Sequence, residues 1–232
     1  MRLRAPARLV GCLALLLSAA GALAQGTFQN LGFEAANLPP IPAGQYGGFV
    51  SSLDGIPGWT GFLGTNQVTQ VLHNAVTLGN ASIDILGPYW SFGGIIEGQY
   101  TVVIQLGLDP FGSGQWVSAS ISQVGLVPAD ARSIRLKADG YSFSVSFAGQ
   151  DLSLIPMGTG ANYTLYGADI SSFAGQVGTL RLTGLTTLSQ PSTTDSFDSI
   201  QFSNLRVPEP GVFGLSALGA LLLGWRVLRR RR

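Results

Sequence analysis

Cysteine, histidine and charged residues are scarce in this chain of 232 residues, which has one cysteine, one histidine and 11% charged side chains. A single cysteine, Cys12, excludes an intrachain disulfide, and zinc sites built from histidine and cysteine are excluded by the same count. Serine hydrolases need a general base, and no Gly-x-Ser-x-Gly motif accompanies His73. The sequence therefore predicts a protein that is not an enzyme, with His73 exposed or at the edge of the core.

Positive charge is nearly absent between residues 26 and 207. Only five of the 13 basic residues lie there, against eleven of the 12 acids, so the net charge of this region is 5 − 11 = −6. Nucleic acid requires a basic surface, so it is excluded as a partner. The negative net charge of this region is compatible with a soluble extracellular module or with one that binds divalent cations.

The N-terminus has the pattern of a secretory signal peptide over residues 1–24. Arg2, Arg4 and Arg8 precede an apolar core at residues 9–17, and Ala22-Leu23-Ala24 precedes Gln25. We expect Sec-type export, with Cys12 leaving in the cleaved peptide.

The C-terminus combines three features in residues 208–232. Pro208-Glu209-Pro210 precedes an apolar stretch at residues 211–228, and Arg229, Arg230, Arg231 and Arg232 end the chain. A bilayer crossing needs roughly 20 residues at ~1.5 Å rise each, so residues 211–228 predict a short transmembrane helix. The arginines stay in the cytoplasm, which places the preceding residues outside.

This three-part pattern resembles the PEP-CTERM sorting signal of Gram-negative bacteria. The resemblance implies transient anchoring in the inner membrane, then recognition and cleavage near Pro208-Glu209-Pro210 by an exosortase. The protein would afterwards reside at the cell surface or in the extracellular matrix. The two prolines keep the motif extended and accessible to such an enzyme.

The region at residues 26–207 has the patterns of one all-β domain. Apolar and polar residues alternate with period two, as a half-buried strand requires. Predicted strands, separated by Gly, Pro, Asn or Asp, cover residues 82–86, 100–106, 117–122, 134–137, 143–147, 162–166, 179–183 and 197–202. About ten antiparallel strands favour a jelly-roll β-sandwich.

Short segments of this domain resemble galactose-binding-like sandwich modules. They are residues 30–34 (Asn-Leu-Gly-Phe-Glu), 56–59 (Ile-Pro-Gly-Trp), 120–123 (Ser-Ile-Ser-Gln) and 197–200 (Phe-Asp-Ser-Ile). The resemblance implies a structural calcium ion held by Glu34 and Asp198, with backbone carbonyls and Asn30 or Asp195 completing the shell. The alternative is that both acids are ordinary solvated or capping carboxylates.

Aromatic residues in turn-rich sequence suggest a sugar-binding surface. Tyr89 and Trp90 lie in the segment 87–94. Trp116 lies on the same face of its predicted strand as the polar residues Ser118 and Ser120. Aromatic faces stack on pyranose rings, so these three residues are candidates for glycan contact, or else pack under loops. Trp59 is expected in the core.

We therefore predict an exported, non-catalytic protein that contacts exopolysaccharide. A self-assembling matrix component without glycan affinity is the alternative. A secreted carbohydrate-active enzyme is a third reading, because glycosidase chemistry needs only two carboxylates and the domain has eleven acids.

Overall fold

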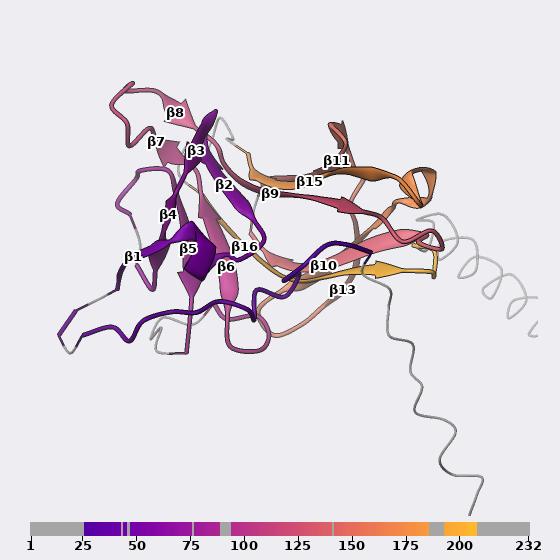
Figure 1. Cartoon of the computed structure of the whole chain (residues 1–232), viewed down its shortest axis with the longest axis horizontal. Helices are drawn as coiled ribbons and strands as arrows, with labels where there is room; N and C mark the ends of the chain where they lie inside the picture. Colours follow the sequence, from indigo (N-terminus) through magenta and orange to yellow (C-terminus); the bar gives the residue numbers. More distant parts are fainter. Residues whose placement is uncertain are drawn as a thin grey trace, which may run out of the picture.

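The computed structural model describes residues 26–42, 44–45, 47–75, 77–88, 94–140, 142–185 and 193–207, which form an all-β fold of two large sheets (Figure 1). The larger sheet has eight strands in the order β1-β4-β5-β6-β16-β10-β14-β13. Their bounds are β1 (Gly48–Ser51), β4 (Gln70–His73), β5 (Ser82–Leu86), β6 (Thr101–Gln105), β10 (Ser133–Asp139), β13 (Ile155–Thr159), β14 (Thr164–Asp169) and β16 (Thr194–Ser203).

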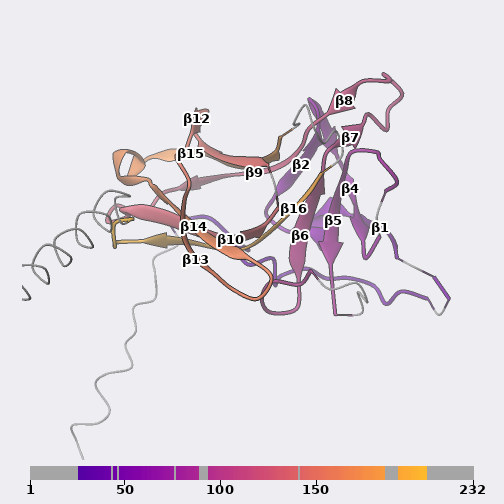
Figure 2. The same cartoon turned by 180° about the vertical axis from the view of Figure 1, so that it is seen from behind.

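The smaller sheet has six strands in the order β12-β11-β15-β9-β2-β3. They are β2 (Thr60–Leu63), β3 (Asn66–Val68), β9 (Ala119–Leu126), β11 (Phe143–Phe147), β12 (Gln150–Asp151) and β15 (Val177–Gly184). A separate hairpin joins β7 (Gly107–Leu108) to β8 (Trp116–Val117), and two short helical turns, α1 (Ser52–Gly55) and η1 (Ser171–Phe173), complete the elements. Figure 2 shows from behind that β1, β4, β7 and β8 gather at one end of the molecule.

One hydrophobic core draws side chains from both sheets. Ile104 and Phe197 of the larger sheet and Ile121 and Leu182 of the smaller sheet are fully buried in the same cluster. Each such side chain contributes about 1.5–3 kcal/mol by leaving water. The alternating patterns that predicted β9, β11 and β15 therefore mark strands with one face on this core, and the all-β prediction is confirmed.

Trp59 lies in the core, as predicted, and is 5% exposed. Its ring packs on Phe33 with centroids 5.7 Å apart. Its indole Nε1 donates a hydrogen bond of 3.1 Å to the carbonyl oxygen of Asn30. The buried indole thereby keeps its polar group satisfied while it fills the space beneath the N-terminal turn.

Two features depart from the predicted pattern. β4 and β5 pair in parallel, through Leu72 with Asp84 and His73 with Ile85, so the sheets are not purely antiparallel. In β9 the polar residues Ser120 and Ser122 are also buried. The Arg181 side chain covers this face: its Nη1 donates to Ser120 Oγ at 3.1 Å, and its guanidinium lies over a phenyl ring of β2.

Candidate functional site

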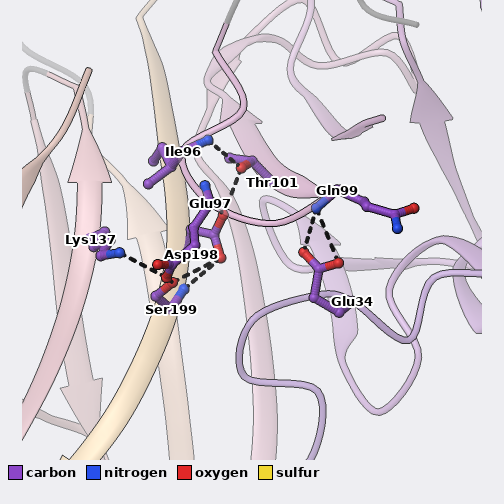
Figure 3. Close-up of polar contacts among 8 residues, drawn as sticks. All are labelled: Glu34, Ile96, Glu97, Gln99, Thr101, Lys137, Asp198 and Ser199. Carbon is purple, nitrogen blue, oxygen red and sulfur yellow. Dashed lines mark hydrogen bonds and ion pairs between the residues drawn. The ribbon is translucent and has the colours of Figure 1, made fainter. Parts of the chain in front are cut away.

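The two predicted calcium ligands, Glu34 and Asp198, line one surface hollow of about 320 Å³. Glu34 belongs to the turn that precedes β1, and Asp198 belongs to β16. The N–H of Ile200 donates to the carbonyl of Leu31 at 2.9 Å, which ties this turn to the last strand. A third acid, Glu97, lines the same hollow from the segment that enters β6 (Figure 3).

Glu34 binds the backbone of the segment before β6. Its Oε1 and Oε2 accept from the N–H of Gln99 at 3.0 and 3.1 Å, and Oε1 also accepts from the N–H of Tyr100 at 3.2 Å. Gly98 has φ +65°, and a Cβ there would lie 2.2 Å from Oε1 of Glu34. Glycine at this position therefore permits both the turn and the close approach of the carboxylate.

Asp198 binds the same segment from the opposite side and is 1% exposed. Its Oδ2 accepts from Thr101 Oγ1 at 2.7 Å and from the N–H of Glu97 at 3.1 Å. Its Oδ1 accepts from the N–H of Ser199 at 2.6 Å. Burial raises the pKa of Asp198 to about 6, the hydrogen bonds oppose this rise, and the nearby Glu34 charge adds to it.

Glu97 is the site residue that the sequence did not indicate. Its carboxylate forms an ion pair of 2.7 Å with Lys137 of β10 and accepts a hydrogen bond from the hydroxyl of Ser199. Hydrogen bonds from Lys137 and Ser199 lower the pKa of Glu97. The ammonium of Lys137 also lies 4.9 Å from the centre of the Tyr163 ring.

The charge and donor set of the hollow fit a divalent cation in part. When ionised, Glu34, Glu97 and Asp198 carry three negative charges against the one positive charge of Lys137, so a cation would offset an excess of two. Most of their oxygens already accept hydrogen bonds, however. Among the described residues, no group of three or more His, Cys, Asp or Glu side chains has the arrangement to hold a metal ion.

The other predicted calcium ligands behave differently from each other. Asn30 lines the hollow, but its Oδ1 accepts from the N–H of Ala35 at 2.9 Å and its Nδ2 donates to the carbonyl of Pro57 at 3.0 Å. Asp195 lies farther along β16, where it accepts from the N–H of Ser142 at 3.2 Å. Asp195 does not line the hollow. The side chain of Asn30 lines it, but both of its polar atoms bind backbone groups of nearby segments.

Trp116, the described member of the predicted glycan surface, is 45% exposed on β8. It pairs across the hairpin with Leu108, and Phe111 between the two strands is 59% exposed. The hairpin therefore presents a partly exposed indole and an exposed phenyl ring to solvent. Tyr89 and Trp90 lie outside the described residues.

His73 is 6% exposed at the end of β4, and burial lowers its pKa. It pairs with Ile85, whereas the neighbouring acid Asp84 pairs with Leu72. Because successive residues of a strand point to opposite faces, His73 and Asp84 face opposite sides of the sheet. Of the two predicted positions for His73, exposed or at the edge of the core, this placement fits the second. It also separates His73 from Asp84, the acid on the neighbouring strand β5.

The sorting residues Pro208, Glu209, Pro210, Arg229, Arg230, Arg231 and Arg232 lie outside the described residues, as do the predicted signal peptide and the predicted helix at 211–228. Within the described part of the chain, no helix is long and apolar enough to cross a membrane.

Comparisons with known proteins add only structural neighbours. No protein-family model matches the sequence, and no curated protein matches it. The chain is similar in structure to the carbohydrate-binding module TmCBM61 in complex with β-1,4-galactotriose (TM-score 0.41, 14% identity, 77% of this chain and 97% of that one). It is also similar to the apo form of a cyclase from Fischerella sp. (TM-score 0.45, 15% identity, 76% and 94% of the two chains).

Proposed function

We propose that this chain is an exported, non-catalytic jelly-roll module that contacts exopolysaccharide at the cell surface or in the extracellular matrix. The observation that carries the proposal is the hairpin of β7 and β8, where Trp116 and Phe111 are exposed on one short element. About half of the surface of each ring remains in contact with solvent, and aromatic rings stack on the apolar faces of sugars.

Calorimetric titration of the purified full chain with the producing cell's own exopolysaccharide tests this function. We expect saturable binding that Trp116→Ala weakens by about tenfold, since one stacked ring contributes on the order of 1 kcal/mol. Leu205→Ala is a matched control, because Leu205 is 62% exposed but lies after β16 rather than on the hairpin. Absence of binding by the unmodified chain would refute the function.

For delivery, we propose Sec-type export, followed by transient anchoring in the inner membrane with the β-domain outside the cytoplasm. An exosortase would then act at Pro208-Glu209-Pro210. The three-part pattern of residues 208–232 supports this route, together with the signal pattern of residues 1–24.

Calcium remains part of the proposal. Glu34 and Asp198 would hold the ion, and backbone carbonyls would supply most of its six to eight oxygen ligands. A bound ion would offset the excess negative charge of the hollow and stabilise the contact between the N-terminal turn and β16. Its role would be structural, since these residues bind backbone amides.

Self-assembly is the second candidate, favoured by the edge strand β1. This strand ends the larger sheet and carries Phe49, which is 71% exposed. Exposed edges with apolar side chains pair readily with other chains. Concentration-dependent oligomers in analytical ultracentrifugation, together with absence of glycan binding, would favour this function over the first.

A further inference from the structure

A second cavity, a cleft of about 350 Å³, opens at the end of the molecule where β1, β3 and β4 lie near the β7–β8 hairpin (Figure 1). It lies where the parallel strands β4 and β5 separate: they pair only at Leu72 with Asp84 and His73 with Ile85. The preceding residues of both strands, including Gln70 and Ser82, line the cleft instead. Its volume lies at the lower end of the range for small-molecule sites, which is about 300–1,000 Å³.

The floor of the cleft is aliphatic. Leu63, Val71 and Ile83 line it and are at most 7% exposed, so they belong to the hydrophobic core as well. An apolar group that enters here replaces water against aliphatic side chains, which is favourable. A hydroxyl group at the same depth would lose its hydrogen bonds to water. The floor therefore selects a small apolar substituent.

The mouth of the cleft combines rings and amides. Phe49 and Phe111 line it and are 71% and 59% exposed. Gln67 and Gln70 also line it. Phenyl faces suit the C–H surface of a sugar ring, and amides both donate to and accept from its hydroxyls.

No charged side chain is among the described residues that line the cleft. A carboxylate or phosphate ligand would leave water without a counter-charge, which is costly. The region at residues 26–207 has a net charge of 5 − 11 = −6, which opposes the approach of an anion as well. Both arguments exclude an anionic ligand, and a sugar without acidic groups meets this condition.

We propose that this cleft binds an uncharged sugar residue that carries a methyl group, either the methyl of an N-acetyl group or that of a 6-deoxy sugar. The methyl group enters the aliphatic floor, while the ring lies between Phe49 and Phe111 and its hydroxyls meet Gln67 and Gln70. This inference rests on the proposed glycan-contacting function and names its sugar class.

Calorimetric titration of the purified full chain with four oligosaccharides tests the proposal. The probes are an N-acetylglucosamine trimer, a rhamnose disaccharide, a glucose trimer and a galacturonate trimer. We expect one or both methyl-bearing probes to bind. The glucose trimer, which lacks the buried methyl group, should bind about fourfold more weakly, and the galacturonate trimer should bind most weakly. The stronger of the first two identifies the source of the methyl group.

Variants separate this inference from the proposed function. Phe49→Ala should weaken the methyl-bearing probe by about tenfold, and it tests the cleft separately from the hairpin because Phe49 lies on β1. Leu53→Ala should change affinity less than twofold, because Leu53 is 84% exposed on α1 and does not line the cleft. Thermal melts of each variant establish that it is folded.

Two results would overturn the inference. One is binding of the galacturonate or glucose trimer that equals that of both methyl-bearing probes. The other is exopolysaccharide binding that survives in folded Phe49→Ala but is lost in Trp116→Ala; the proposed function would then stand without the cleft. A wild-type chain that binds neither exopolysaccharide nor any probe refutes both.

Discussion

Replacing Asp84 by asparagine is expected to stabilise the protein, and to do so most at alkaline pH. Asp84 is 4% exposed in the middle of β5. Its Oδ2 accepts from the N–H of Ala75 at 3.1 Å, but its Oδ1 has no hydrogen-bond partner among the described residues. A buried carboxylate with one unsatisfied oxygen is an unfavourable charge.

The magnitude follows from the pKa of this group. Burial raises the pKa of Asp84 from 3.8 to about 7. Since one pKa unit corresponds to about 1.4 kcal/mol, the ionised side chain costs the folded state about 4 kcal/mol above pH 7. The folded protein binds more protons than the unfolded chain between about pH 4 and pH 7, so the free energy of unfolding rises as the pH falls through this window.

The Asp84→Asn variant lacks this titration. Its side-chain amide retains an oxygen that can accept from the N–H of Ala75, and it is neutral at every pH. The gain in unfolding free energy over the wild type should be at most about 4 kcal/mol at pH 8, because the buried amide N–H groups of asparagine lack a partner, and about 2–3 kcal/mol smaller at pH 5. Asp198 titrates in both proteins, so its contribution cancels in the difference.

Urea denaturation of the full chain at pH 8, 7, 6 and 5, followed by tryptophan fluorescence, measures this difference. Equal slopes against urea for the two proteins would establish that the unfolding transition itself is unchanged. Asp130→Asn removes the same charge from an exposed turn and serves as the control. A gain that does not vary with pH, or a variant that is less stable than the wild type at pH 8, would refute the reasoning.

Two further predictions concern delivery and calcium. Changing Pro208, Glu209 and Pro210 together to alanine should leave the protein unprocessed, which mass spectrometry and fractionation of the producing cell detect; unchanged mass and localisation would exclude a role for the motif. Removing calcium with EDTA should lower the Tm of the wild type but not that of Asp198→Asn, because an ion that binds only the folded state stabilises it by mass action; equal melts with and without EDTA would remove calcium from the proposal.

Most strands that the sequence predicted have an apolar residue at every second position. In β11, Phe143, Val145 and Phe147 alternate with serines, and Val145 and Phe147 reach the core. Three of the missed strands, β1, β3 and β4, have no such alternation over their three or four residues. β3 forms a short hairpin with β2, whereas β1 pairs with β4 across the intervening β2 and β3, a pairing that local periodicity does not encode.

Asp84 shows how the same pattern can mislead. In β5, Ser82 and Asp84 alternate with Ile83 and Ile85, which reads as one core face and one solvated face. All five residues of the strand are buried, however. The sequence shows the alternation of polar and apolar residues, but it does not show whether other parts of the chain cover the polar face of the strand. A buried carboxylate therefore looks the same in the sequence as an exposed one.

In the acidic hollow, two of the three acids were predicted from local sequence motifs and the third was not. Glu34 and Asp198 were found through short motifs, and the hydrogen bond from Ile200 to Leu31 explains why those motifs meet. Glu97 has no motif around it. Its position follows from Glu34 and Asp198, which bind the N–H groups of Gln99 and of Glu97 itself and so fix the segment that carries its side chain. A residue whose place is set by two carboxylates from opposite ends of the chain is predictable only after the fold is known.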